Sequence, residues 1–563
     1  MADKDLLEPA KKYRLELKNA HHERVVTYFD DLTKKAGTDV AANKSTCDRI
    51  RAKVKERDKI QKKINSGIWL AILFGILCLI IVGIFLFIYV YRPRQKRLKA
   101  ELDKVNKEIE RLEQEAWAQM ASLNALFDSE VPFRLFSQTC PLIQMDRNFD
   151  IAKFEQLISQ YGMWSNTDQD RSTLNLQSGS ILGNPFVFFK DIVMKMCPHT
   201  YQGSLTITWT ERVRGEKGYY TVVRTQTLVA TVTKPKPEYS HETYLVYACD
   251  AAPHLTFHRG PSEMRGMDEK KREHYVKKHE KDLFKYAQSQ MGKGGTYTPL
   301  GNAEFELSFG GLNRNNEVEY RLLFTPLAQK AMIDVLFSPE GYGDDFFFKK
   351  DKYINIVESG HAAGTAIFLE SRDFRGYDYE AVRKFFIDYN DNFFKSIYFD
   401  FAPLMAIPLY QQMKSHEYIY KNTIKSWSTP FEHEVMANRF DPRNFAHKDT
   451  VTDVILKTNF MNKVGNEDNV KVTGHSFRSV AHVELVPKLG GDGRMHNVPV
   501  TWYEYIPLTS DGFIQVGNVG GDERQFTNFG LEHVIYRKGL VAHTANLNVD
   551  INSLKSQMAK KEN

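Results

Sequence analysis

The feature that most constrains this chain is an uncharged apolar stretch of 24 residues, Ile68 to Tyr91, which reads IWLAILFGILCLIIVGIFLFIYVY. As an α-helix it would be about 36 Å long at roughly 1.5 Å per residue. The hydrocarbon core of a bilayer is about 30 Å thick, so one tilted helix of this length can cross it. The sequence therefore predicts a single transmembrane helix over residues 67–91, which contains Ile68, Trp69, Gly75, Cys78, Gly83 and Tyr91.

Charge does not decide the orientation of this predicted span, because the fifteen residues on either side each contain six Lys and Arg. The chain has five cysteines, no CxxC pair, and no Asn-x-Ser/Thr motif after the span. These features favour a large domain on the cytosolic side. A re-entrant hairpin that turns at Gly75 or Gly83 is the alternative, although 24 residues are short for two passes.

The residues before the span, 1–66, form a basic tail with 17 Lys and Arg against 11 Asp and Glu. Such a tail can attract anionic lipid headgroups, but basic residues flank many spans without a specific role. Apolar residues recur at helical spacing over 5–36 and 40–66, on either side of a turn at Gly37–Asp39. The tail is therefore expected to fold as an antiparallel helical pair.

The residues after the span, 92–127, carry the most regular periodicity in the chain. Apolar side chains follow one another at steps of four and three, at Leu98, Leu102, Val105, Ile109, Leu112 and Ala116. This a/d pattern predicts a charged helical stalk. Two interpretations stay open: a coiled coil that makes the protein a homo-oligomer, or a helix packed on the chain's own large domain.

The remaining sequence predicts an α+β domain over 128–420, a β-rich subdomain over 421–550 and a tail over 551–563. A hairpin turn at Gly215–Gly218 precedes a long strand over 219–233, which Pro235 and Pro237 are expected to end before a third strand over 242–249. A second hairpin is expected over 477–486 and 496–506. Other expected strands are 303–309, 317–324 and 365–369, and the expected helices are 150–162, 267–290, 325–336 and 378–398.

No established catalytic motif is present, and the weaker candidates have simpler explanations. His254 and His258 could be metal ligands, but strand context and the lack of a third ligand argue against it. His482 and Glu484 share a strand face, which favours a sheet pair over an acid–base pair. The loop Gly292–Gly295 lacks phosphate-loop spacing, and Asp344 and Asp345 read as a polar turn.

Together these patterns predict a membrane-anchored α+β protein with an N-terminal helical pair, one span, a coiled-coil-like stalk and a large domain of antiparallel hairpins with packed helices. The residues after the span carry 59 basic and 59 acidic side chains, which argues against nucleic-acid binding. The leading hypothesis is a membrane-tethered, non-catalytic scaffold without a cofactor or metal, whose partners are the lipid bilayer, its own copies and another protein. The alternatives are a membrane-bound hydrolase-like enzyme and an extracellular receptor or adhesin.

Overall fold

A computed structural model of the chain describes residues 8–77, 91–147, 149, 151–164, 168–215, 218–293, 295, 297–365, 367–411, 428–465, 467–519 and 534–544. The helices are α1 (Pro9–Lys12), η2 (Tyr13–Leu17), α2 (Lys18–Ala36), α3 (Val40–Leu77), α5 (Arg92–Asn124), α6 (Val131–Thr139), α7 (Ile151–Ser159), α8 (Glu269–Gly292), α9 (Ala303–Ser308), α10 (Glu317–Leu323), α11 (Pro326–Phe337), α12 (Gly360–Gly364), η4 (Ser371–Phe374), α13 (Tyr379–Met405), η5 (Pro408–Gln411), α14 (Pro430–Arg439) and η7 (Pro442–Phe445).

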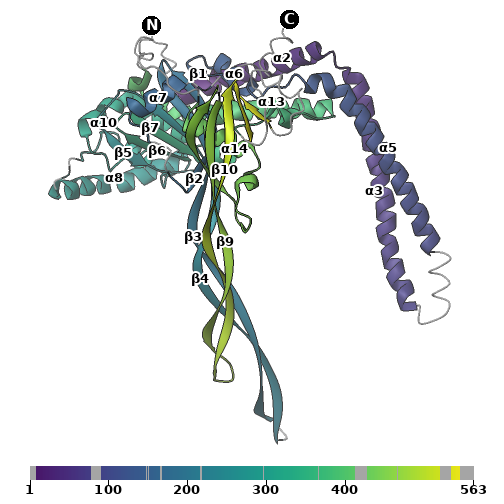
Figure 1. Ribbon diagram of the computed structural model, residues 1–563. Helices are drawn as coiled ribbons and strands as arrows, with labels where there is room; N and C mark the ends of the chain where they lie inside the picture. Colours follow the sequence, from purple (N-terminus) through teal and green to yellow (C-terminus); the bar gives the residue numbers. More distant parts are fainter. Residues whose placement is uncertain are drawn as a thin grey trace. The chain divides into compact units, whose positions relative to one another are not determined.

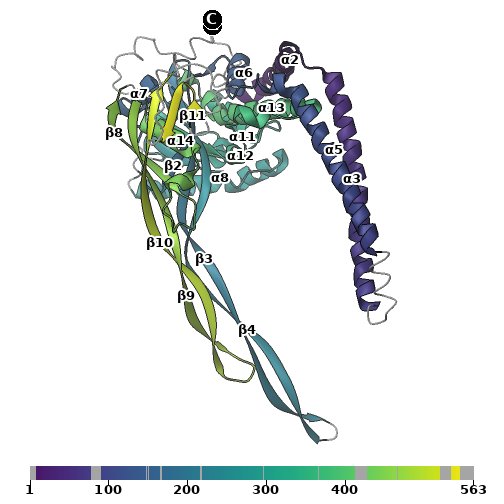
Figure 2. The same cartoon turned by 45° about the vertical axis from the view of Figure 1, so that its right-hand side comes forward.

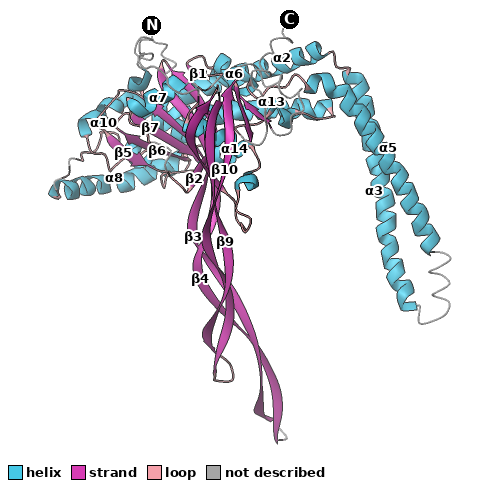
Figure 3. Cartoon of the chain, in the orientation of Figure 1, coloured by secondary structure: helices cyan, strands magenta, loops and turns pink. Residues whose placement is uncertain are grey.

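The strands are β1 (Ile143–Met145), β2 (Arg171–Ile181), β3 (Asn184–Gly215), β4 (Gly218–Ala248), β5 (Thr256–Arg259), β6 (Phe346–Asp351), β7 (Ile354–Ser359), β8 (Ile455–Val464), β9 (Glu467–Leu489), β10 (Met495–Asn518), β11 (Val534–Arg537) and β12 (Leu540–Thr544). Figure 3 shows helices and strands in separate colours. The chain divides into two compact units, a helical unit of residues 12–141 and 365–398, and a β unit of residues 1–11, 142–364 and 399–563. The predicted α+β composition with antiparallel strands is confirmed.

In the helical unit, the predicted turn at Gly37–Asp39 is confirmed. Gly37 ends α2 in the left-handed region, with φ of 62°, which glycine adopts without the steric cost of a Cβ. The Asp39 carboxylate then accepts a hydrogen bond from the Ala42 N–H at 2.9 Å and begins α3. The antiparallel partner of α3 is α5, however, and not α2 as the sequence suggested.

The heptad stripe of α5 lies against α3 of the same chain. Cys47 and Ile50 near the start of α3 cluster with Leu112 and Ala116, and Ile60 and Ile64 further along α3 cluster with Val105 and Ile109, while Leu98 and Leu102 are partly buried. The order of these contacts makes the two helices antiparallel, as Figure 1 shows. The stripe therefore packs as one half of an intramolecular antiparallel helix pair. Homo-oligomerisation through it stays a prediction.

The prediction of a single transmembrane helix, and with it of a membrane-anchored single-pass protein, is wrong. The described part of α3 runs to Leu77, α5 (Arg92–Asn124) runs in the opposite direction, and the Gln95 side chain donates to the Ile64 carbonyl oxygen at 3.5 Å. One helix over residues 68–91 would instead place its flanks about 36 Å apart. Within the described residues, no helix has both the length and the apolar character that a membrane crossing needs.

The individual residues of the predicted span are placed as follows. The backbone of Ile68, Trp69 and Gly75 belongs to α3, so the helix runs through Gly75 without the turn that the re-entrant alternative required there. Cys78 and Gly83 lie outside the described residues, and Tyr91 directly precedes α5.

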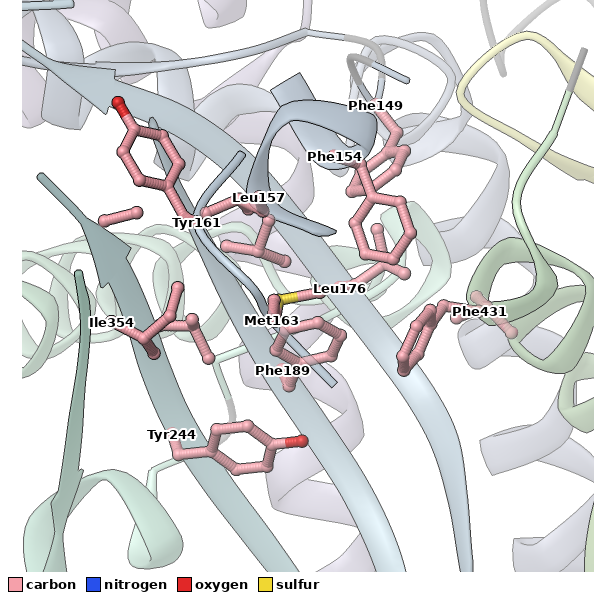
Figure 4. Packing of buried hydrophobic residues seen from close by; sticks show 14 residues of the cluster. Phe149, Phe154, Leu157, Tyr161, Met163, Leu176, Phe189, Tyr244, Ile354 and Phe431 are labelled. Atoms are coloured by element: carbon pink, nitrogen blue, oxygen red, sulfur yellow. The ribbon is translucent and has the colours of Figure 1, made fainter. Parts of the chain in front are cut away.

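The β unit contains two antiparallel sheets that share one helix. Their strand orders are β1-β2-β3-β4-β7-β6-β5 and β11-β12-β10-β9-β8. Phe431 and Val435 of α14 pack on the first sheet, in the cluster of buried side chains drawn in Figure 4. Met436 and Ala437, on another face of α14, pack on the second sheet. The helix thus anchors both sheets, and the strands that leave them as long hairpins start from a common core.

The two hairpins expected from the sequence are confirmed, but their strands are longer than predicted. β4 is one strand through Pro235 and Pro237, where the sequence suggested two strands of a meander. Pro235 lies opposite Pro198 and Pro237 lies opposite Met196. Opposed pairs in an antiparallel ladder alternate between hydrogen-bonded and non-hydrogen-bonded, and all three prolines belong to the non-hydrogen-bonded pairs. In that class the N–H groups point away from the partner strand, so a missing N–H costs no ladder hydrogen bond.

Three other expected strands are absent at their predicted positions. Residues 303–309 and 317–324 instead form the short helices α9 and α10, which begin where the side chains of Asn302 and Asn316 accept backbone N–H groups of the first turn. The described residues of 365–369 belong to no strand. The expected helices are confirmed as α7, α8, α11 and α13, and Thr325 caps α11 through the Ala328 N–H.

Candidate functional site

The two histidines considered and disfavoured as metal ligands from the sequence each contact a different residue. His254 Nδ1 is 2.7 Å from Glu319 Oε1, whereas the ring of His258 contacts the side-chain amide of Asn313. Across the described ranges, no group of three or more His, Cys, Asp or Glu side chains is arranged to hold a metal ion.

His482 and Glu484 also serve separate contacts. His482 Nε2 is 2.8 Å from Glu504 Oε2 on the neighbouring strand, and Glu484 Oε2 is 2.9 Å from Lys234 Nζ on β4. The loop that begins at Gly292 follows the end of α8. A phosphate loop opens a helix instead, so the interpretation of this segment as a connection is the simpler one.

Asp344 and Asp345, read from the sequence as a polar turn, are both buried and both paired. Asp344 Oδ1 lies 2.7 Å from Arg259 Nη2, and neither side chain is exposed. Asp345 accepts from His361 Nδ1 at 2.9 Å. His361 itself stacks on the ring of Tyr342, with centroids 3.9 Å apart.

The second ring nitrogen of His361 faces Ser359 and Asp400, which completes a set of residue types found in hydrolase triads. His361 Nε2 is 3.3 Å from Asp400 Oδ1 and 3.4 Å from Ser359 Oγ. Ser359 Oγ, however, donates its hydrogen to Asp400 Oδ1 at 2.6 Å. The serine proton is thus directed at a carboxylate and not at the imidazole.

The charge state of His361 also argues against catalysis. Burial by itself lowers its pKa, but the carboxylates of Asp400 and Asp345 outweigh burial and raise the pKa to about 10. At neutral pH the ring is an imidazolium without a lone pair, so it cannot accept a proton from Ser359 as a general base. The cluster is therefore best explained as a buried set of ion pairs and hydrogen bonds. It joins Ser359 at the end of β7, Asp400 of α13 and Asp345 in the turn before β6.

A second buried group of the same residue types lies beside α14. Ser428 Oγ is 2.7 Å from His433 Nε2 and 2.9 Å from Asp468 Oδ2. All three residues are at most 3 % exposed. Because a substrate cannot reach a side chain this deeply buried without a rearrangement, this group too is best explained as part of the core.

The most distinctive feature of the β unit is the pair of long hairpins, β3–β4 and β9–β10, which Figures 1 and 2 show leaving the sheets side by side. Alternation in β3 and β4 gives the first hairpin two different faces. One face carries cross-strand threonine pairs, at Thr200–Thr233, Thr206–Thr227 and Thr208–Thr225, with hydroxyl oxygens 3.1 to 3.4 Å apart. The other face is apolar and meets β9–β10.

The apolar faces of the two hairpins form a cluster of their own, built from Leu228, Ala230, Val232, Val498 and Val500. An isolated two-stranded hairpin is marginally stable in water, so this shared burial supports both. At the far end of the cluster, the Gly491 N–H donates to Gln226 Oε1 at 2.7 Å. A Cβ on Gly491 would lie 2.8 Å from the ring of Trp209, so the turn of β9–β10 packs directly on this tryptophan.

β3–β4 extends past the turn of β9–β10, as Figures 1 and 2 both show. We call residues 210–215 and 218–223 the distal arm. Tyr219, Tyr220 and Val223 in it are 69 %, 55 % and 65 % exposed. Burying such side chains in a partner is favourable by about 1.5 to 3 kcal/mol for a full-sized apolar group. Exposed apolar side chains that cluster in this way are typical of interaction sites.

Register determines which residues share a face of the distal arm. Arg212 lies opposite Thr221 and Arg214 lies opposite Tyr219, whereas Val223 lies opposite Thr210. Opposed residues of an antiparallel pair point to the same side, so both arginines flank Tyr219 and Val223 on one face. Neither arginine forms an ion pair within the part of the chain that the structure describes, so this arginine–tyrosine face is both apolar and positively charged.

Sequence reasoning located this hairpin but did not identify its tip as a site. The available signal was the pair of tyrosines after Gly218 together with the alternation of Arg212 and Arg214. What was missing was the register of β3 and β4, which places Arg214 opposite Tyr219 on the same exposed side as the threonine pairs, away from β9–β10. No protein-family model matches the chain, and no curated protein or solved structure was found to be similar to it.

Proposed function

We propose that this chain is a non-catalytic binding protein, and that its distal arm docks on an acidic surface of another protein. The observation that carries the proposal is the arginine–tyrosine face, where exposed Tyr219 lies opposite Arg214 and exposed Val223 is the next residue on that face beyond Arg212 and Thr221. A tyrosine anchor beside arginines is the composition enriched at the energetic centre of protein interfaces.

Charge complementarity supports an acidic occupant. Arg224 is paired with Glu211 at 3.1 Å, which leaves Arg212 and Arg214 to meet carboxylates of a partner. An arginine–carboxylate contact can be bidentate, and it gains strength as the neighbouring tyrosine excludes water. The exposed edges of β3 and β4 offer backbone N–H and C=O groups to an extended segment of the same partner.

A protein partner is favoured over a nucleic acid, which is also acidic. Tight binding to a nucleic acid replaces many counterions and requires an extended basic surface. Among the described residues, the distal arm has two arginines without an ion pair on this face, and the threonine pairs nearer the core on the same hairpin are uncharged.

The experiment is site-specific photo-crosslinking in cells that produce the full chain. A benzophenone side chain is placed at Thr221, inside the arginine–tyrosine face, or at Thr227, which is exposed on the same hairpin nearer the core. We expect a discrete protein adduct from position 221 that is absent from position 227. The adducted protein, once identified and purified, should bind the full chain with an affinity that falls as salt rises.

The double substitution Arg212→Gln and Arg214→Gln should weaken that purified complex by about tenfold or more, because hydrogen bonds to charged groups contribute roughly 1.5 to 3 kcal/mol each. The control Lys488→Gln removes an exposed charge from the other hairpin and should leave affinity unchanged. Equal crosslinking at both positions, an adduct to nucleic acid, or full affinity in the double variant would each overturn the proposal.

A further inference from the structure

A second feature of the β unit is a cavity of about 840 Å³ between β4, β10 and the loop that connects η7 to β8. Its lining includes Lys236 of β4, Arg443 of η7 and Lys448 of the loop. The cavity lies within one compact unit and does not include any residue of the distal arm. An inference from it is therefore independent of the protein-binding proposal.

The cavity lining has an excess of positive charge. Considering only the residues that the structure describes, Lys236, Arg443 and Lys448 form no ion pair, although many other basic side chains of the chain do. The one carboxylate in the described lining is Asp453, and the Nδ1 of His447 in the lining accepts a hydrogen bond from the Asp449 N–H at 3.2 Å. Three cations without carboxylate partners around one cavity raise the local concentration of an anion.

The cavity wall is held in place by the strands behind it. The Val451 N–H donates to the Phe477 carbonyl oxygen at 3.0 Å, and the Phe477 N–H donates to Thr452 Oγ1 at 3.1 Å. On the opposite side, the Tyr239 hydroxyl donates to Thr452 Oγ1 at 3.1 Å. Thr452 thus connects the loop to both β9 and β4. Because the loop is already held in place, a ligand that binds here loses little free energy to ordering it.

Phe445 anchors the beginning of the same loop. It is 4 % exposed, and a Cβ at Gly474 would lie 2.3 Å from its carbonyl oxygen, so the loop backbone passes directly over β9. Arg443 and Lys448 therefore project from a segment that is fixed at both ends.

We propose that this cavity binds an organic phosphate ester. Its volume falls in the range of about 300 to 1,000 Å³ that is typical of sites for small organic ligands, and it exceeds the needs of an inorganic ion. A phosphate group carries close to two negative charges, which suits one guanidinium and two ammonium groups better than a single carboxylate does. The rings of Tyr239 and Tyr505 in the lining supply apolar surface for the organic part.

Isothermal titration calorimetry of the full chain tests this inference with five probes: AMP, ribose 5-phosphate, adenosine, inorganic phosphate and pyrophosphate. We expect at least one of the two phosphate esters to bind more tightly than inorganic phosphate and pyrophosphate. Adenosine should bind more weakly than AMP, because it lacks the charged group. Each of Arg443→Gln and Lys448→Gln should weaken ester binding by about tenfold, and Lys488→Gln should not.

The melting temperature of each variant shows whether it is folded, and Lys236→Gln provides a third test from a different element if the loop variants lose structure. Binding of ribose 5-phosphate as tightly as AMP supports a site for the phosphate and sugar, whereas preference for AMP supports a site that also uses the tyrosine rings. No ester binding, equal binding of adenosine and AMP, binding of inorganic anions only, or full affinity in folded variants of Arg443, Lys448 and Lys236 would overturn the inference.

Discussion

Gly203 of β3 lies where the two long hairpins approach most closely, so replacing it with alanine tests their packing directly. A Cβ at this position would lie 2.0 Å from the Pro499 carbonyl oxygen and 2.9 Å from the Val500 Cα. Both are backbone atoms, which cannot rotate away as a side chain could. Since non-bonded atoms settle at about 3.5 Å or more, the hairpins would have to separate locally by roughly 1.5 Å.

The expected effect of Gly203→Ala is a loss of stability, although two contributions oppose each other. Overpacking of a closely packed site costs about 1 to 3 kcal/mol. Alanine also restricts the unfolded chain, which stabilises the fold by about 0.4 to 1 kcal/mol where the backbone conformation permits a side chain. The net expectation is a destabilisation of about 1 to 2 kcal/mol, concentrated in the cluster that contains Leu228, Ala230 and Val500.

Amide hydrogen exchange is the appropriate assay, because the hairpins can separate without unfolding either unit. A change of about 1.4 kcal/mol corresponds to tenfold faster exchange, so residues 201–207 should exchange about 5 to 30 times faster in Gly203→Ala. The control is Ser204→Ala, one residue along and on the opposite, exposed face. If Gly203→Ala protects these amides as well as the control does, the close approach of β3 to Pro499 is refuted.

Three further predictions concern buried ionisable groups. Burial lowers the pKa of His21 to about 3, so stability of the helical unit should fall by about 3 kcal/mol between pH 7 and pH 4, and His21→Gln should remove this slope in hydrogen exchange of that unit. Burial raises the pKa of Glu432 to about 7, so stability of the β unit should instead fall by about 3 kcal/mol as pH rises from 4.5 to 7, and Glu432→Gln should abolish the trend. The pKa of His361 is raised to about 10, so NMR should show its ring still protonated at pH 8, and the stability it contributes should be lost only as pH rises from 6.5 through 10. Replacing His361 by Asn should cost about 3 to 5 kcal/mol in urea denaturation, because two buried carboxylates lose their partner.

Local patterns in the sequence determined most of the secondary structure. Alternation and paired glycines identified both long hairpins, and the cap at Thr325 located the start of α11. The errors occurred where local and tertiary effects compete. Pro235 and Pro237 indicated a strand end, but the register of β3 and β4 places both prolines where no ladder hydrogen bond is needed.

The apolar stretch from Ile68 to Tyr91 shows the same limit more clearly. Its composition predicts a preference for an apolar environment, and the stripe from Leu98 to Ala116 predicts an amphipathic helix. Neither pattern could say that the helices on the two sides pair with each other. That is decided by the buried cluster that joins Ile60 and Ile64 of α3 to Val105 and Ile109 of α5, which are far apart in the sequence.

The candidate sites depend on tertiary structure for a related reason. Periodicity describes which side chains share a face of one element, but it carries no information about distances between elements. The sequence by itself determined the alternation of Arg212 and Arg214 and the presence of two tyrosines directly after Gly218. Only the tertiary structure decided the register that places Arg214 opposite Tyr219, and that Lys236 and Arg443 line one cavity, because both facts follow from how separate elements pack.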